Sequence, residues 1–111
     1  VILNLISNAK DAFENTPKSF DRKIEILIEA DDVHGIVYVA DNAGGIDEEI
    51  IGRIFDPYFT TKEEGKGTGI GLYMSKTIVE TNMGGVLDVA NKDKGAVFTI
   101  KIPLSDGTAG I

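Results

Sequence analysis

The chain has 111 residues, enough for one hydrophobic core of two layers and too few for two separate cores. With 42% apolar and 26% charged residues its composition is ordinary for a globular protein, and the sequence shows no long apolar run and no signal peptide. The formal charge of −7 argues against a nucleic-acid-binding or anionic-membrane surface, and the lack of cysteine excludes disulfides, thiolate metal sites and cysteine nucleophiles.

Residues 1–14 are predicted to form an amphipathic helix. Apolar residues at spacings of three and four define a face that we expect to pack on a sheet: Ile2, Leu5, Ile6, Ala9, Ala12 and Phe13. A second face has a polar stripe: Asn4, Asn8, Asp11 and Asn15. Such residues are unfavourable inside helices because their side chains compete for backbone hydrogen bonds. The stripe is therefore either a solvated face or a row of donors and oxygen ligands, where an amide oxygen can complete the shell of Mg²⁺.

Two strands are predicted next, joined by a turn over residues 31–35. Residues 23–30 alternate, with Ile24, Ile26 and Ile28 on one side, which indicates a half-buried strand. Residues 36–40 are apolar on both faces, which predicts a central strand, and the short link makes the pair an antiparallel hairpin. We interpret the single histidine, His34, as an exposed turn residue rather than a group with a proton or phosphoryl role.

An acidic residue and a small-residue turn follow the central strand directly, in the segment Asp41-Asn42-Ala43-Gly44-Gly45-Ile46. This arrangement places a carboxylate at the mouth of a pocket whose wall is backbone. There it can accept a hydrogen bond from an amino group of a flat ring that lies against the glycines. The alternative is an ordinary Asp-Asn-x-Gly turn.

A long connection begins after a short helix, which is predicted over residues 47–54. Periodicity disappears between residues 55 and 68, and a connection of this length without structure of its own is typical of a lid or binding loop. We interpret Phe55 and Phe59 as anchors for one end of this lid; the alternative is that both are simply core residues.

The lid runs into Gly65-Lys66-Gly67-Thr68-Gly69-Ile70-Gly71-Leu72, directly before a helix predicted over residues 71–83. Alternate glycines permit positive φ and close approach of a ligand, and a helix start offers unpaired N–H groups, so the pattern favours phosphate binding. It matches neither the Walker A nor the Rossmann pattern, and a flexible glycine loop is the alternative. Strands follow at residues 85–90 and 96–103, with Phe98, Ile100 and Ile102 facing the core.

The order of elements predicts a two-layer α+β sandwich, in which a mixed, largely antiparallel sheet has helices on one face. Three elements would bind different parts of one ligand. The asparagine-striped helix would bind metal and phosphate, and the strand that ends in Asp41 would bind a base. The glycine-rich segment would also bind phosphate. Together they predict a nucleotide pocket.

Four motifs in this order resemble those of the catalytic, ATP-binding domain of sensor histidine kinases, in the gyrase, Hsp90, histidine kinase and MutL superfamily. They are the asparagine box, the first glycine box, the phenylalanine box and the second glycine box, at residues 3–9, 41–46, 54–59 and 67–72. The resemblance covers residues 1–104 and implies the Bergerat ATP-binding fold without its first helix and strand. Residues 105–111 are expected to be a frayed tail, and the chain a fragment of a longer parent.

The resemblance also implies a site for ATP and Mg²⁺. Asn8 would bind Mg²⁺, Asp41 would accept a hydrogen bond from the adenine amino group, and Gly45 would let the base lie close to the backbone. The nucleotide-binding set would be Asn8, Asp11, Asp41, Ala43, Gly45, Ile46, Lys62, Lys66, Gly67, Thr68, Gly69, Ile70, Gly71 and Leu72. Within this set, Lys62 or Lys66 would add positive charge from the lid.

Two residues depart from the family pattern. Ala43 replaces a glycine, which is tolerable if its φ is negative. Asp11 stands where many members have a lysine near the phosphates, so another cation or Mg²⁺ must compensate for the missing charge.

The residue at position 4 helps to distinguish hydrolysis of ATP from transfer of its phosphoryl group. In the hydrolytic branches of the superfamily this position usually resembles Glu, which can take a proton from attacking water, and an asparagine amide cannot act as that base. With Asn4 and Asn8 as catalytic residues, the site would align the γ-phosphate for an external nucleophile. The resemblance thus implies transfer to a histidine on a separate dimerisation and phosphoacceptor domain; His34 lacks the sequence context of that acceptor.

The same resemblance implies a response regulator downstream, a homodimeric parent and a cytoplasmic location for this domain, in a parent that is either cytoplasmic or membrane-anchored. No direct membrane contact and no nucleic-acid partner are expected. Two other functions stay open: an ATPase or serine kinase of the same superfamily, against which Asn4 argues, and a nucleotide-binding pseudo-kinase, of which Ala43 and Asp11 would be signs.

Overall fold

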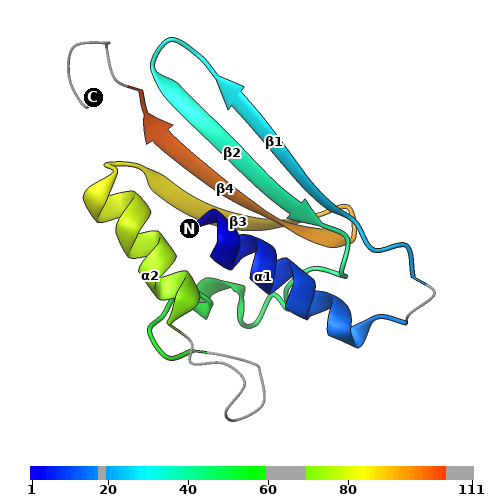
Figure 1. Cartoon of the computed structure of the whole chain (residues 1–111). Coiled ribbons are helices and arrows are strands. Elements are labelled where there is room, and N and C mark those ends of the chain that lie inside the picture. The colour runs from blue at the N-terminus through cyan, green and yellow to red at the C-terminus, as the bar shows by residue number, and fades with distance from the viewer. Residues whose placement is uncertain (18–19, 60–69, 105–111) are drawn as a thin grey trace.

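The structure is a computed structural model that describes residues 1–17, 20–59 and 70–104, and these residues form two layers (Figure 1). One layer is a four-stranded sheet with the strand order β1-β2-β4-β3, in which every neighbouring pair is antiparallel. In the other layer, the helices α1 and α2 lie side by side against one face of the sheet. The two-layer α+β architecture is the predicted one.

The described elements begin and end at defined residues. The strands are β1 Ile24–Ala30, β2 His34–Asp41, β3 Val86–Lys92 and β4 Gly95–Pro103. The α-helices are α1 Ile2–Ala12 and α2 Gly71–Thr77. Three short helical segments complete the set: η1 Phe13–Asn15, η2 Ile51–Arg53 and η3 Ile78–Asn82, the last being a π-helix that continues α2.

The core lies between the helices and the central strands β2 and β4. The register pairs Val39 with Phe98 and Val37 with Ile100, which places these four side chains on the helix-facing side. The buried core cluster consists of Leu5, Val39, Ile54, Val79, Leu87, Phe98 and Ile100. As predicted, therefore, the sheet buries its β4 residues against the helices.

Each α-helix buries one face, as the spacing of its apolar residues predicts. In α1, Leu5 and Ala9 are buried, and Phe13, the first residue of η1, continues this face and is buried as well. Ile2, at the beginning of the predicted stripe, remains 40% exposed, and Ala12 is exposed too. In α2 the buried face continues from Ser75 into Val79 of the π-helical turn. Both helices are thus held by packing rather than by side-chain caps, which neither has.

The first strand differs from the expectation of a half-buried strand, because all seven residues of β1 are exposed. Its register with β2 places Ile26 opposite Val39, so the isoleucines do share the face that the helices cover. However, β1 is at the edge of the sheet, and α1 packs over β2 instead. Ile28 is consequently 71% exposed. The alternation identified the correct face of the strand, but the described helices leave that face uncovered.

Two smaller predictions were also wrong. Residues 47–54, expected to form a short helix, contain hydrogen-bonded turns and the 3-10 segment η2. His34, expected in an exposed turn, is instead the half-buried first residue of β2, and its backbone N–H donates to Asp31 Oδ1 over 2.6 Å.

None of the helices in the described part of the chain combines the length and the apolar character that a transmembrane helix requires.

Candidate nucleotide-binding site

The polar stripe of α1 meets the beginning of α2. Asn4 donates a hydrogen bond from Nδ2 to Ser75 Oγ over 3.2 Å, and Ser75 is completely buried. The Asn4 amide also lies beside Gly71, because a Cβ built on Gly71 would be 3.8 Å from Asn4 Cγ. Asn4 of the asparagine box and Gly71 of the second glycine box, 67 residues apart in the sequence, are therefore adjacent in space.

One turn further along α1, Asn8 is half-buried, and it forms no hydrogen bond with any residue that the structure describes. Asp11 is half-buried as well. In the described part of the chain, no group of three His, Cys, Asp or Glu side chains could hold a metal ion. Mg²⁺ commonly keeps several waters and takes one or two protein oxygens besides substrate phosphates. The Asn8 amide oxygen fits such a site, in which the nucleotide provides most of the ligands.

Asp41 ends β2 with one carboxylate oxygen occupied. Its Oδ1 accepts hydrogen bonds from the backbone N–H groups of Ala43, over 3.0 Å, and Ala96, over 3.3 Å. These bonds fix the direction of the half-buried carboxylate. Oδ2 accepts no hydrogen bond from a described residue, so it is available to an amino group of a ligand.

The first glycine box turns through two left-handed residues, Gly44 with φ 102° and Gly45 with φ 83°. Ala43 does not have a positive φ, which meets the condition under which alanine was expected to be tolerated there. Glycine at 44 and 45 is needed because other L-residues rarely adopt these angles. The backbone of the box is further held by a hydrogen bond of 2.7 Å from Gly44 N–H to the carbonyl oxygen of Lys94.

Asn91 of β3 fixes the other end of the same box and was not identified from the sequence. Its Oδ1 accepts from the Ile46 backbone N–H over 2.7 Å, and its Nδ2 donates to the Ile46 carbonyl oxygen over 2.6 Å and to Glu48 Oε1 over 3.0 Å. A Cβ on Gly45 would lie only 2.9 Å from Asn91 Oδ1. Because 45 residues separate Asn91 from Ile46, no local pattern could have shown this bond.

Gly95, the first residue of β4, was likewise missed, since its pattern indicated no role beyond the turn. A Cβ built on this residue would overlap the backbone oxygen of Asp41 and come within 3.0 Å of Asn42 Cα. The absence of a side chain at this position therefore allows the β3–β4 hairpin to pack directly against the end of β2.

The phenylalanine box is fixed to the core at both of its phenylalanines. Phe55 meets Phe98 edge-to-face, with ring centroids 6.1 Å apart at 87°. The Phe59 ring lies under the Arg53 guanidinium, 4.8 Å from Cζ, and both phenylalanines are half-buried against the core cluster. Both phenylalanines thus pack against the core, as the second interpretation expects. Most of the predicted lid lies outside the described residues, so the interpretation of Phe55 and Phe59 as its anchors stays a prediction.

Lys76 and Glu80 connect the second helix to β3. Lys76 Nζ lies 3.0 Å from Glu80 Oε2, donates to the Leu87 carbonyl oxygen over 2.9 Å and sits 4.8 Å from the Phe55 ring centroid. Glu80 in turn accepts from the Leu87 backbone N–H over 3.4 Å. The hydrogen bond from Lys76 is the main reason why the pKa of Glu80 is lowered.

Only part of the second glycine box can be placed. Ile70 is half-buried and precedes α2, Gly71 is exposed, and Leu72 packs against the core. The remaining predicted phosphate-binding residues lie outside the described residues: Lys62, Lys66, Gly67, Thr68 and Gly69.

These features define the class of the protein: an α+β nucleotide-binding domain, with a helix of amide side chains and a carboxylate at the end of a central strand. A family model described as "Histidine kinase-, DNA gyrase B-, and HSP90-like ATPase" matches residues 1–106. The two-component sensor PprA of Pseudomonas aeruginosa is 46% identical over 107 residues, which are 95% of this chain and 12% of that protein.

Solved structures agree with this match. The nucleotide-free catalytic domain of histidine kinase ThkA superposes with a TM-score of 0.75 and 36% identity, over 92% of this chain and 63% of that one. Histidine kinase ThkA in complex with response regulator protein TrrA gives a TM-score of 0.69 and 30% identity, over 96% of this chain and 29% of that one.

The chain therefore belongs to the histidine kinase-, DNA gyrase B- and HSP90-like ATPase family, which confirms the family and the fold that the four motifs predicted. The chain spans 12% of the length of the sensor PprA.

Proposed function

We propose that this chain is the ATP-binding kinase module of a two-component sensor histidine kinase. In this proposal it transfers the γ-phosphoryl group of ATP to a histidine on a separate phosphoacceptor domain. The observation that supports this best is the environment of Asn4, whose amide bonds to Ser75 Oγ beside Gly71. The position thus holds a neutral donor rather than a base for water, which favours an external nucleophile over hydrolysis.

Adenine would bind at the end of β2. Asp41 Oδ2 would accept a hydrogen bond from the adenine amino group, because Oδ1 is already occupied by backbone N–H groups. The ring would lie against Gly45 and the half-buried side chain of Ile46. The flat surface that this requires is provided by the backbone, since Asn91 holds Ile46 at both its N–H and its carbonyl oxygen.

The triphosphate would extend from the base toward α1 and the beginning of α2. Asn8 would hold Mg²⁺, which when bound neutralises charge on the phosphates. The backbone of residues 67–71 would wrap the phosphates, and Lys62 or Lys66 would add charge. An imidazole nitrogen of the acceptor histidine then attacks the γ-phosphorus, the bond from that phosphorus to the β-γ bridging oxygen breaks, and ADP leaves. This chain contributes alignment and electrostatics rather than a covalent step.

The partners follow from the reaction. We propose a dimerisation and phosphoacceptor domain in the parent chain, a homodimeric parent, and a response regulator that receives the phosphoryl group. A cytoplasmic location for the domain is proposed on the same basis, because ATP is available there. The domain would occupy residues 1–104, and the first helix and strand of the family would be absent from this sequence. The 63% coverage of the ThkA catalytic domain and the exposed face of β1 support this domain assignment.

The test is phosphotransfer in a mixture of this chain, ATP labelled at the γ-phosphate and the parent's phosphoacceptor domain. A label on protein that is stable to base and labile to acid is the expected result. Asn8→Ala should abolish labelling, whereas the matched control Asn82→Ala, at an exposed position in η3, should not. Free phosphate without labelled protein would instead indicate an ATPase, and an acid-stable label a serine kinase.

A measurement of nucleotide binding alone distinguishes the proposed kinase from a pseudo-kinase. A non-hydrolysable ATP analogue is titrated into the chain with and without Mg²⁺. The proposal predicts tighter binding with Mg²⁺, and Asn8→Ala should remove most of that difference. An affinity that does not depend on Mg²⁺, or no binding at all, would favour a pseudo-kinase, in which Ala43 and Asp11 would be signs of lost activity.

A further inference from the structure

The sheet has a second face, opposite the helices, and its middle is largely apolar, with Thr99 among the apolar side chains. Because side chains alternate along a strand, Tyr38 and Ala40 lie on the face opposite the buried Val39. The strand registers place two rows of side chains across this face: Glu25, Ala40, Val97 and Ala90 in one, and Leu27, Tyr38, Thr99 and Asp88 in the next. A sheet face turned to solvent normally has polar residues along its central strands. In the middle of this face they are mostly apolar.

The apolar side chains line a groove. It has a volume of about 760 Å³, and its floor includes Leu27, Tyr38 and Val97. The first of these is 54% exposed, while the other two are half-buried. None of the described helices lies on this face, so the apolar floor is open to a ligand (Figure 1).

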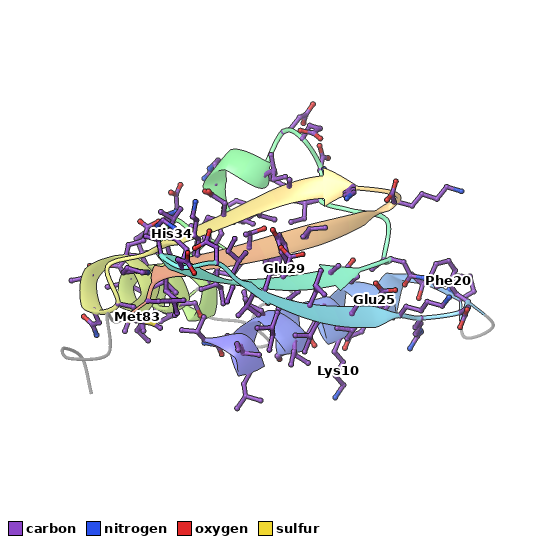
Figure 2. The ribbon with its side chains drawn as sticks, turned by 90° about the horizontal axis from the view of Figure 1, so that it is seen from above. Lys10, Phe20, Glu25, Glu29, His34 and Met83 are labelled. Carbon is purple, nitrogen blue, oxygen red and sulfur yellow. The ribbon has the colours of Figure 1, made fainter. Side chains whose placement is uncertain are left out.

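Acidic residues border the groove on both sides. Glu25 and Glu29 stand along β1, where Figure 2 shows them on the same strand, and Asp88 stands on β3 at the opposite edge of the sheet. None of these three forms a salt bridge with a described residue. Two lysines also line the groove, Lys23 and Lys92, and the former is paired with Asp21 over 3.6 Å.

The negative border decides which class of partner fits. Nucleic acid and anionic lipid would be repelled, and a second copy bound through the same face would bring like charges together. We propose that the open face of the sheet binds a protein segment that forms a cationic amphipathic helix. Lys or Arg side chains of this helix would meet Glu25, Glu29 and Asp88, and its apolar stripe would cover the floor.

The dimensions fit one helix. The outer strands of a four-stranded sheet are roughly 14 Å apart, and a helix with its side chains is about 10–12 Å wide. Along β1, Glu25 and Glu29 are separated by about 13 Å, which matches two cationic residues about eight positions apart in a helix. Lys101 lies on this face in the row of Glu29, opposite Ile36, and limits the groove at that end.

A designed peptide tests the proposal. The probe is a helical 18-residue peptide with a leucine stripe flanked by lysines eight positions apart, and its affinity for the 111-residue chain is measured by fluorescence anisotropy. The triple variant Glu25→Gln, Glu29→Gln and Asp88→Asn should weaken binding at least tenfold. The matched triple Glu14→Gln, Asp32→Asn and Glu49→Gln changes the net charge equally at exposed positions elsewhere and should weaken it less than twofold.

A variant of the apolar floor tests the proposal independently of charge. Leu27→Thr should lower the affinity for the peptide severalfold, and threonine is a residue that favours strands. Binding of the ATP analogue should be unchanged in all of these variants, so the outcome is separate from that of the proposed kinase function. If both triple variants lower the affinity for the peptide equally, the peptide is attracted only by the net negative charge of the chain, and the proposal is overturned. Failure of the peptide to bind, or binding of phosphatidylserine vesicles to the same face, would overturn it as well.

Discussion

Asn4 of α1 and Ser75 of α2 form a side-chain hydrogen bond between the two described α-helices, 3.2 Å from Nδ2 to Oγ. Ser75 is fully buried, whereas Asn4 is exposed. The bond thus fixes the beginning of α2 relative to the asparagine box. Since residues on both helices would face the phosphates, their relative position is part of the proposed nucleotide site.

The first prediction concerns this bond. Ser75→Ala should lower the free energy of unfolding by about 1 kcal/mol, because a buried hydrogen bond is lost while the Asn4 amide can be solvated. Urea unfolding of Asn4→Ala, Ser75→Ala and the double variant should give a coupling energy of about 1 kcal/mol. Ser7→Ala, at an exposed position of α1, is the control. Strictly additive effects would show that the bond contributes no stability.

The second prediction concerns Asp41. In Asp41→Asn the remaining Oδ1 can still accept from Ala43 and Ala96, so stability should change little. The new amide nitrogen, however, replaces the acceptor proposed for the adenine amino group. ATP-analogue affinity, measured by calorimetry, should fall ten- to a hundredfold, about 1.5–3 kcal/mol. Asp32→Asn in the exposed turn should bind normally, and unchanged affinity in Asp41→Asn would refute the assignment of the base site.

The third prediction compares two glycines. Gly95→Ala should lower the free energy of unfolding by more than about 2 kcal/mol, because its Cβ would overlap the backbone of Asp41 and Asn42. Gly52→Ala is the matched control: Gly52 is exposed, a Cβ at this position would have no neighbour within 4 Å, and its φ is not positive, so the change should stay within about 1 kcal/mol. Thermal unfolding of both variants measures the difference, and equal melting temperatures would contradict the close approach.

The fourth prediction is a pH dependence. The pKa of Glu80 is lowered, first by the hydrogen bond from Lys76, so the unfolded chain binds the proton more tightly than the folded one. The resulting stabilisation is present at neutral pH and is lost as the pH falls through the pKa of the folded state. The difference in unfolding free energy between the natural chain and Glu80→Gln should therefore shrink as urea unfolding is repeated at pH 7, 5 and 3. A difference that is constant with pH would exclude this contribution.

The sequence predicted local features well and distant contacts poorly. Spacing identified the buried residues Leu5, Ala9 and Phe13, and the short link predicted the antiparallel hairpin of β1 and β2, because these patterns depend on near neighbours. By contrast, Ser75 and Asn91 act through bonds to residues 71 and 45 positions away, which no local pattern contains.

The prediction that β1 is half-buried was wrong for a related reason. Alternation shows which side chains share a face, but whether a second layer covers that face depends on how far the helices extend over the sheet. Ile26 and Ile28 have the period of a buried face and remain exposed at the edge. The roles proposed for the site residues stay predictions, since each depends on a bound nucleotide.

β1 lies at the edge of the sheet. Among the described strands, β1 pairs only with β2, so along its other side alternate N–H and C=O groups point outward beside exposed isoleucines. Such an edge accepts a further strand from any chain that can provide one. The isolated chain should therefore self-associate as its concentration rises, through backbone pairing rather than through any feature of the nucleotide site.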